Sequence, residues 1–263
     1  MRNLVKQDSY LLDLIESSLR SKIQAEEAAH GKNGKPPDSL WGHISRVAIL
    51  AEKIGKAEGV DPTTCRLAGL FHDAGKFAGG NYHACEEPEE KFSVTALREI
   101  TRGLAIPSEI LQNVEEAILQ LYRHDHDPTK LTKILFDADN LDKLGLLGVA
   151  NYFVKAGLRG KGISSSFLIQ LTVELTYARH APKCLLTQTG RQMAAKRAPE
   201  TILFFKRFLE SVRDDGLFNF RIDEVLYDGI IIDVVAPTEC ECGGNLTREI
   251  WELPGLKCSE IHL

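Results

Sequence analysis

Apolar residues recur every three or four positions along most of this chain, and that spacing restricts what the chain can fold into. The first segment shows the pattern in a single stripe, made of Leu11, Leu12, Ile15, Leu19 and Ile23. A strand places neighbouring positions on opposite faces, whereas a helix gathers residues three and four apart on one face. The spacing therefore predicts amphipathic helices that bury their apolar stripes against one another.

The expected helix ends are marked by residues that cap or interrupt a helix. The Gly31–Pro37 run breaks the first helical pattern, and Asp61 followed by Pro62 combines a cap with a first-turn proline. The helix that begins there is expected to run out at Gly75, and a later helix to run unbroken over about 131–156. We therefore predict a mainly α-helical protein built as a helical bundle.

The last part of the chain has a different pattern. Arg221–Tyr227 and Ile230–Val235 are rich in β-branched residues, and Asp228-Gly229 lies between them. An Asp-Gly pair between two such runs is typical of a two-residue hairpin turn. We therefore expect three parts: an N-terminal helix over 1–35 that packs on the bundle, a helical domain over 36–215, and a small C-terminal β-hairpin with a cysteine-containing tail over 216–263.

Charge and composition limit the partners that this chain can have. Its 263 residues carry a formal net charge of −5, which favours neither nucleic acid nor an anionic membrane surface. The sequence shows no apolar run long enough to cross a bilayer and no apolar signal core at its start. We expect a cytoplasmic protein with no membrane or nucleic-acid partner, and a homo-oligomer stays open.

Histidines and aspartates interrupt the apolar pattern at a few places. His72 and Asp73 are adjacent at the end of an apolar predicted helix, and His43 lies at the edge of the stripe on the preceding helix. Adjacent residues on a helix point about 100° apart, so both can reach one ion only near a helix end. A single buried histidine is more often a hydrogen-bonded core residue, and a single His-Asp pair is more often a surface cap. His43, His72 and Asp73 therefore indicate a metal site only when they are considered together.

Three carboxylates, Asp137, Asp139 and Asp142, lie within one strongly apolar stretch. Buried carboxylates are tolerated where they are paired or bind a metal ion. Helix geometry places Asp142 nearest the centre of the apolar face, with Asp137 and Asp139 about 100° to either side. Geometry alone leaves the choice among the three open, and an exposed acidic face is the alternative.

These residues lie in three short motifs that follow one another along the chain. They are Gly42-His-Ile-Ser-Arg-Val47, Leu70-Phe-His-Asp-Ala-Gly-Lys76 and Asp137-Ala-Asp-Asn-Leu-Asp142. Over roughly residues 40–215 the sequence resembles the HD superfamily of metal-dependent phosphohydrolases, and among them its small stand-alone hydrolases. The resemblance implies a divalent metal ion held by His43, His72, Asp73 and Asp139. Asp139 is selected because the family's ligand follows an alanine, and Asp137 is the runner-up.

The implied ligand set also indicates an ion and a substrate. Mixed imidazole and carboxylate ligands suit Mn, Fe, Co, Ni or Zn better than Mg. Asp73 is expected to orient the attacking water, and Lys76 to contact the substrate phosphate. The resemblance also implies a pocket histidine, for which we select His124, that contacts the substrate phosphate or a second metal ion. The expected activity is hydrolysis of a nucleotide or another small phosphoester. The alternative is a sensor module that binds metal and nucleotide without turnover.

Two further features have competing interpretations. Arg46 follows His43 by three residues and can face the site or pair with Glu52 at the surface. A structural zinc at the C-terminal cysteines is the second hypothesis, although Cys-x-Cys is tighter than the usual spacing of two to four intervening residues. Its alternative is reduced thiols in a surface tail. The cysteines concerned are Cys240, Cys242 and Cys258.

Overall fold

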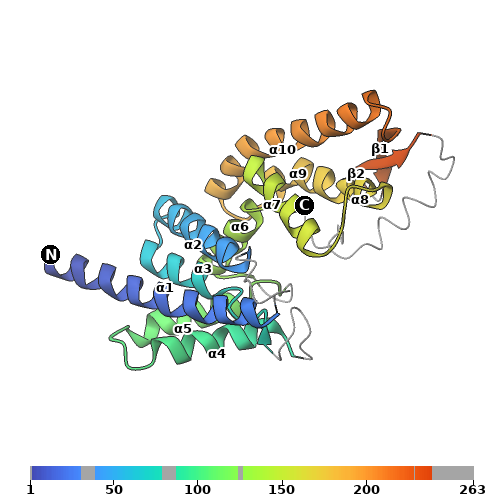
Figure 1. The fold of residues 1–263 in the computed structure, drawn as a ribbon. Helices are drawn as coiled ribbons and strands as arrows, with labels where there is room; N and C mark the ends of the chain where they lie inside the picture. The colour runs from blue at the N-terminus through green and yellow to red at the C-terminus, as the bar shows by residue number, and fades with distance from the viewer. Residues whose placement is uncertain (1, 31–38, 79–86, 124–126, 228, 239–263) are drawn as a thin grey trace. The chain divides into compact units, whose positions relative to one another are not determined.

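The computed structural model describes residues 2–30, 39–78, 87–123, 127–227 and 229–238. The fold is mainly helical with a two-stranded antiparallel hairpin near the C-terminal end, as predicted (Figure 1). The chain divides into two compact units, Met1–Asp142 and Lys143–Leu263. The domain limits expected from the sequence at 36 and 216 stay predictions. None of the helices in the described part is long and apolar enough to cross a membrane.

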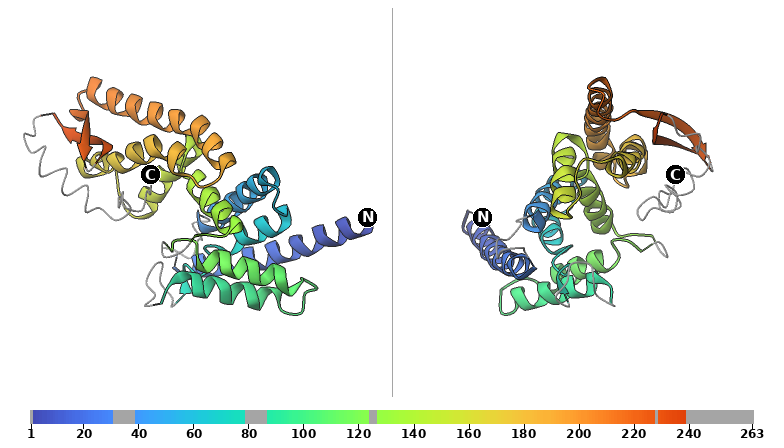
Figure 2. Two further views of the ribbon diagram at one scale, coloured as in Figure 1. Left: turned by 180° about the vertical axis from the view of Figure 1, so that it is seen from behind. Right: turned by 45° about the vertical axis from the view of Figure 1, so that its right-hand side comes forward.

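The helices of the first unit begin where local capping signals place them. Asp61 accepts a hydrogen bond from the Thr64 amide at the start of α3, and Thr129 accepts one from the Thr132 amide at the start of α6. Helices α4 and α5 lie side by side, which Figures 1 and 2 show from different directions. The helices are α1 (Arg2–His30), α2 (Ser39–Glu58), α3 (Pro62–Phe71), α4 (Glu89–Thr101), α5 (Ser108–Leu119) and α6 (Lys130–Leu141).

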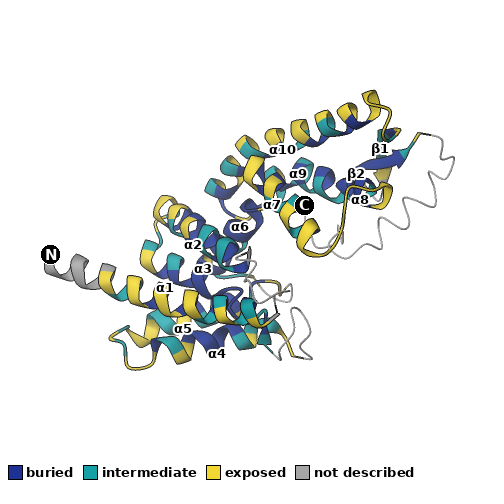
Figure 3. Ribbon diagram, in the orientation of Figure 1, coloured by how far each residue is buried: buried dark blue, intermediate teal, exposed yellow. Residues whose placement is uncertain are grey.

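The core of this unit lies where α2, α3 and α6 pack against one another. Figure 3 shows that α3 and α6 are largely buried. Each large aliphatic or aromatic side chain that is fully buried stabilises the fold by about 1.5–3 kcal/mol. The largest fully buried side chains here are Ile15, Leu19, Ile23, Ile44, Ile54, Leu70, Phe71, Leu97, Ile118, Ile134 and Leu135.

The elements of the second unit are α7 (Gly145–Leu158), α8 (Ser165–Ile169), α9 (Leu171–Cys184), α10 (Gln188–Asp214), β1 (Phe220–Tyr227) and β2 (Ile230–Pro237). In this unit α8, α9 and α10 pack against the hairpin, and α7 packs on α10. The predicted unbroken helix over about 131–156 is wrong, because α6 ends at Leu141 and α7 begins at Gly145. Gly145 has a φ of 79°, which a right-handed helix cannot continue through.

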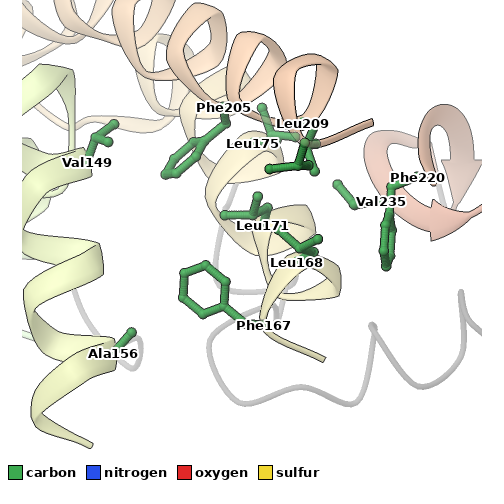
Figure 4. Packing of buried hydrophobic residues seen from close by; sticks show 11 residues of the cluster. Val149, Ala156, Phe167, Leu168, Leu171, Leu175, Phe205, Leu209, Phe220 and Val235 are labelled. Atoms are coloured by element: carbon green, nitrogen blue, oxygen red, sulfur yellow. The ribbon is translucent and has the colours of Figure 1, made fainter. Parts of the chain in front are cut away.

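The core of the second unit is an aromatic and aliphatic cluster. Figure 4 shows side chains from its helices and from both strands pointing toward one another. Phe205 of α10 and Leu171 of α9 are fully buried in it, and Val235 of β2 closes it from the hairpin side. The hairpin is therefore part of this unit's core.

Helix α9 covers one edge of the hairpin. The amides of Asp233 and Val235 donate to the hydroxyls of Thr176 and Thr172, at 3.0 and 2.8 Å. Arg179 adds a two-bond ion pair to the Asp233 carboxylate. Because side chains of α9 satisfy these outward-facing groups of β2, this edge is not free to pair with another strand.

Candidate metal centre

The first unit brings the four predicted metal ligands together. His43 lies on α2, His72 and Asp73 directly follow α3, and Asp139 lies on α6. The His43 Nε2 atom lies 3.2 Å from His72 Nε2, 3.2 Å from Asp73 Oδ2 and 3.2 Å from Asp139 Oδ1. All four side chains are buried. His43, His72 and Asp73 have ligand atoms within 4.8 Å of one another, as a shared ion requires.

The two imidazoles present the same ring atom to the centre. His43 Nδ1 lies 2.9 Å from an Asp142 oxygen, and His72 Nδ1 lies 2.8 Å from the Gly69 carbonyl oxygen. Both partners are acceptors, so each Nδ1 donates. A neutral ring that donates from Nδ1 carries its lone pair on Nε2. Two such lone pairs and two carboxylates facing one point fit a divalent cation, and this outward hydrogen bonding is typical of metal-binding histidines.

The pKa values of His43 and Asp73 are shifted by the charged groups around the centre. Burial would lower the pKa of His43, but hydrogen bonds to Asp139, Asp142 and Asp73 outweigh it and raise the value to about 10. Burial would raise the pKa of Asp73, but the charges of His72 and Lys76 lower it. The carboxylates around His43 therefore favour positive charge at the centre.

Close packing of α2 and α3 sets the distance between the two rings. A Cβ atom on Gly69 would lie 2.5 Å from the Cα of Ala48, closer than real Cβ atoms approach other atoms. Only glycine at this point lets α3 lie directly on the α2 backbone. The His43 and His72 ring centroids are consequently 5.2 Å apart.

A tight turn after α3 presents both residues of the His-Asp pair. The predicted continuation to Gly75 as helix is wrong, because α3 ends at Phe71. The amides of Ala74 and Lys76 then donate to carbonyls three residues back, a tighter spacing than in an α-helix. At this helix end the two adjacent side chains do reach one point, since His72 Nε2 lies 3.4 Å from Asp73 Oδ2.

Helix α4 holds this turn in place. Ser93 Oγ accepts a hydrogen bond from the Gly75 amide at 2.9 Å and donates one to the His72 carbonyl at 3.1 Å. A Cβ on Gly75 would lie 2.3 Å from the Glu89 carbonyl oxygen, so the α4 backbone occupies the space beside the turn. One buried hydroxyl thus fixes the backbone on both sides of Asp73.

The structure gives the carboxylates near the end of α6 different positions. Asp139 Oδ1 faces His43 Nε2, and its other oxygen accepts a hydrogen bond from the Tyr122 hydroxyl at 2.5 Å. Asp142 lies at the opposite ring nitrogen of His43. Burial would raise the pKa of Asp142, but hydrogen bonds from His43 and Arg46 lower it to about 2. Asp137 is buried as well. That Asp139 is the fourth ligand stays a prediction.

Two basic residues lie beside the centre. Lys76 Nζ is 2.5 Å from Asp73 Oδ2, and its side chain is 18% exposed, so this cation borders the site. Arg46 turns inward and donates to both oxygens of Asp142. The alternative pairing of Arg46 with Glu52 is wrong, because Glu52 pairs with Arg66. His124, expected in the site, and the cysteines at 240, 242 and 258 lie outside the described residues.

Several contributors to the site lie outside the sequence motifs. Tyr122, Ser93 and Gly69 reach the centre or its backbone only through the packing of separate helices. No short pattern marks Tyr122 or Ser93, because each depends on a partner at least 17 positions away. The apolar run around Gly69 signals a buried helix but not this close approach.

Comparisons with known proteins agree with this arrangement. Residues 40–144 match the model of the HD domain family. The chain is 28% identical over 183 residues to the protein YpgQ of Bacillus subtilis, which covers 65% of this chain and 82% of that protein.

Solved structures share the fold. The crystal structure of Bacillus subtilis YpgQ has a TM-score of 0.57 at 22% identity and covers 78% of this chain and 97% of that one. A crystal structure of YpgQ in complex with ADP gives a TM-score of 0.55 at the same identity and covers 78% and 96%. A predicted HD superfamily hydrolase from an uncultured Thermotogales bacterium gives 0.53 at 21% identity and covers 75% and 90%.

Proposed function

We propose that this chain, whose residues 40–144 match the HD domain family, is an HD-superfamily divalent-metal-dependent phosphohydrolase acting on a nucleotide or another small phosphoester. The main support for this proposal is that the Nε2 atoms of His43 and His72 lie 3.2 Å apart. Each ring donates outward from Nδ1, and Asp73 and Asp139 oxygens complete the set.

The donor set favours particular ions. Two imidazoles and two carboxylates suit Mn, Fe, Co, Ni or Zn better than Mg, which prefers oxygen ligands. Bound there, such an ion lowers the pKa of its water and neutralises charge on the phosphoryl group. His43, His72, Asp73 and Asp139 are the residues that hold it in this proposal.

Residues around the ligands supply the remaining chemistry. Asp73 lies against His43 and Lys76 at once, so its carboxylate can orient the attacking water beside the substrate. Lys76 borders the centre, and we assign it to the transferred phosphate. Tyr122 holds one oxygen of Asp139 and keeps the other directed at His43.

A nucleotide is the first substrate class to test. The similar protein YpgQ has been crystallised in complex with ADP, and this chain covers nearly the whole of that structure. The negative charge of a nucleotide's phosphates also matches a centre built from a divalent ion and the Lys76 ammonium.

The test is phosphate release from a panel of nucleotides and sugar phosphates, with Mn, Co, Ni, Zn and Mg supplied in turn. We expect turnover with at least one transition metal and one nucleotide. Metal binding and nucleotide binding without phosphate release under any condition would replace the hydrolase with a sensor module.

The ligand assignment has an internal control. Asp139→Asn should lower metal per folded chain to near zero, because the carboxylate facing His43 is lost. Asp137→Asn, also on α6 and also buried, should keep its metal. Elemental analysis after gel filtration measures both variants. Loss of metal from Asp137→Asn alone would show that the runner-up is the true ligand.

A further inference from the structure

We infer that Arg46 and Asp142 form an orienting arm that sets the ring position and donor strength of His43, and so the affinity of the centre for its metal ion. The inference rests on the proposed function, because it concerns the same centre. Neither residue is in the ligand set, so both act through His43 as positioning residues.

The hydrogen bonds of Asp142 leave little freedom to its carboxylate. One oxygen accepts a hydrogen bond from Arg46 Nε at 2.6 Å. The other accepts from Arg46 Nη2 at 3.0 Å and from His43 Nδ1 at 2.9 Å. A guanidinium that donates through two nitrogens fixes the plane of a carboxylate as well as its position. The plane of Asp142 in turn fixes the His43 ring.

Burial makes this arrangement different from a surface ion pair. Asp142 is 5% exposed and His43 is 5% exposed, whereas the Arg46 side chain is 25% exposed. A buried carboxylate without donors would be costly, so Arg46 offsets the cost of keeping a negative charge beside the ring. The arginine contacts Asp142, which lies at His43 Nδ1, the ring nitrogen that does not face the other ligands.

An anionic acceptor at Nδ1 changes what Nε2 can do. It holds the proton on Nδ1, so the lone pair stays at Nε2 facing the other ligands. It also makes Nε2 a stronger donor to a metal ion. The arm ties α2, which carries His43 and Arg46, to Asp142, the residue that directly follows α6 and lies three positions after Asp139. Asp142 thus sets both the position of the His43 ring and the strength of its Nε2 atom as a metal donor.

A matched pair elsewhere separates this role from general stability. Arg98 of α4 makes the same two-bond contact with Glu115 of α5, but at the surface and away from the centre. If Arg46 only tied helices together, its loss and that of Arg98 would affect the free energy of unfolding and nothing else.

The experiment titrates Mn²⁺ into full-length wild type, Asp142→Asn, Arg46→Met, Arg46→Lys and Arg98→Met, with each affinity referred to the folded fraction. We expect Mn²⁺ affinity to fall about 10–100-fold in Asp142→Asn and Arg46→Met, the range for lost outer partners of metal-binding histidines. Arg46→Lys keeps the charge but not the two-bond fork, so it should lie between these and wild type. Arg98→Met should bind like wild type.

A spectroscopic readout completes the test. At saturating Co²⁺ the visible absorption bands should shift in Asp142→Asn and stay unchanged in Arg98→Met, because the former alters the ligand field through His43. Should Asp142→Asn fail to fold, the two variants of the partly exposed Arg46 carry the test. Unchanged Mn²⁺ affinity and Co²⁺ spectra in the folded variants would contradict the orienting role of Arg46 and Asp142. The proposed hydrolase activity would not be affected by that result. A wild type that binds no divalent ion would overturn both.

Discussion

At the scale of single residues, each group that faces the centre is held by a neighbour outside the ligand set. The Gly69 carbonyl holds His72, and the Tyr122 hydroxyl holds Asp139. A ligand whose orientation is fixed in advance loses less conformational freedom when the ion binds. Metal affinity should therefore respond to changes at these neighbours even where every ligand is intact.

Tyr122 offers a clean test, because its side chain is 47% exposed and removing its hydroxyl creates no cavity in the core. Tyr122→Phe should weaken Mn²⁺ binding about 10-fold or more, since Asp139 then loses the hydrogen bond that orients its second oxygen. The free energy of unfolding should change by about 1 kcal/mol at most, the usual scale of one hydrogen bond. Titration calorimetry and urea unfolding measure the two effects. Tyr10→Phe, on the exposed face of α1, is the control. Equal affinities in both variants would contradict the role given to Tyr122.

At the scale of helices, the approach of α3 to α2 determines whether the two rings can share an ion. Gly69→Ala adds a methyl group where the Ala48 backbone lies, so the helices must separate or bend. We expect a loss of about 1–3 kcal/mol in the free energy of unfolding, the usual cost of overpacking, together with weaker metal binding.

Gly157→Ala is the control for this substitution. Its Cβ would meet nothing within 4 Å, and it lies near the end of α7. It should be neutral or stabilising by up to about 1 kcal/mol, because alanine favours helix. Wild-type stability and metal affinity in Gly69→Ala would show that the close approach does not matter.

Helix α9 carries a carboxyl group, that of Glu174, whose pKa is raised by burial. Burial raises the pKa of Glu174 from 4.5 to about 7, although the charges of Lys143 and Lys155 oppose the shift. Between these two values the folded chain keeps a proton that the unfolded chain has lost. The free energy of unfolding contributed by this group therefore falls as pH rises through that window.

Glu174→Gln removes this pH dependence. The variant should match wild type near pH 4.5 and be more stable above pH 7, by up to about 3 kcal/mol, since each pKa unit corresponds to about 1.4 kcal/mol. Urea unfolding at pH 5 and pH 8 measures the difference. Glu210→Gln, at an exposed position of α10, should show no such trend. A variant less stable than wild type at pH 8 would mean that the charged form is favoured.

Local signals predicted helix starts well and helix ends less well. The start of α3 at Asp61-Pro62 and the Asp-Gly hairpin depend on residues adjacent in sequence, and both occur as predicted. The early end of α3 depends on α4 crossing at Gly75, and the break after α6 depends on the backbone of Gly145. The sequence motifs identified four candidate metal ligands. The contacts of Tyr122 and the inward turn of Arg46 required the packed structure.

At the scale of the whole molecule, the described part of the candidate centre lies within the unit Met1–Asp142. Removal of residues 239–263, which include Cys240, Cys242 and Cys258, should therefore leave its metal content and phosphate release unchanged. Elemental analysis of full-length and shortened protein tests this. Loss of one zinc per chain with activity intact would support a separate zinc site at these cysteines. Loss of the activity would show that the tail contributes to the hydrolase.

The hydroxyl of Ser93 affects how the sequences of homologous proteins should be interpreted. It holds the backbone on both sides of Asp73, yet it lies about 20 positions downstream, outside the three short motifs that carry the candidate ligands. A homologue with alanine there would keep every signature residue while its His-Asp turn lost both supports, and two buried backbone groups would lose their partner. An intact signature is therefore not enough to infer a working enzyme, and the residue aligned with Ser93 should be checked beside it.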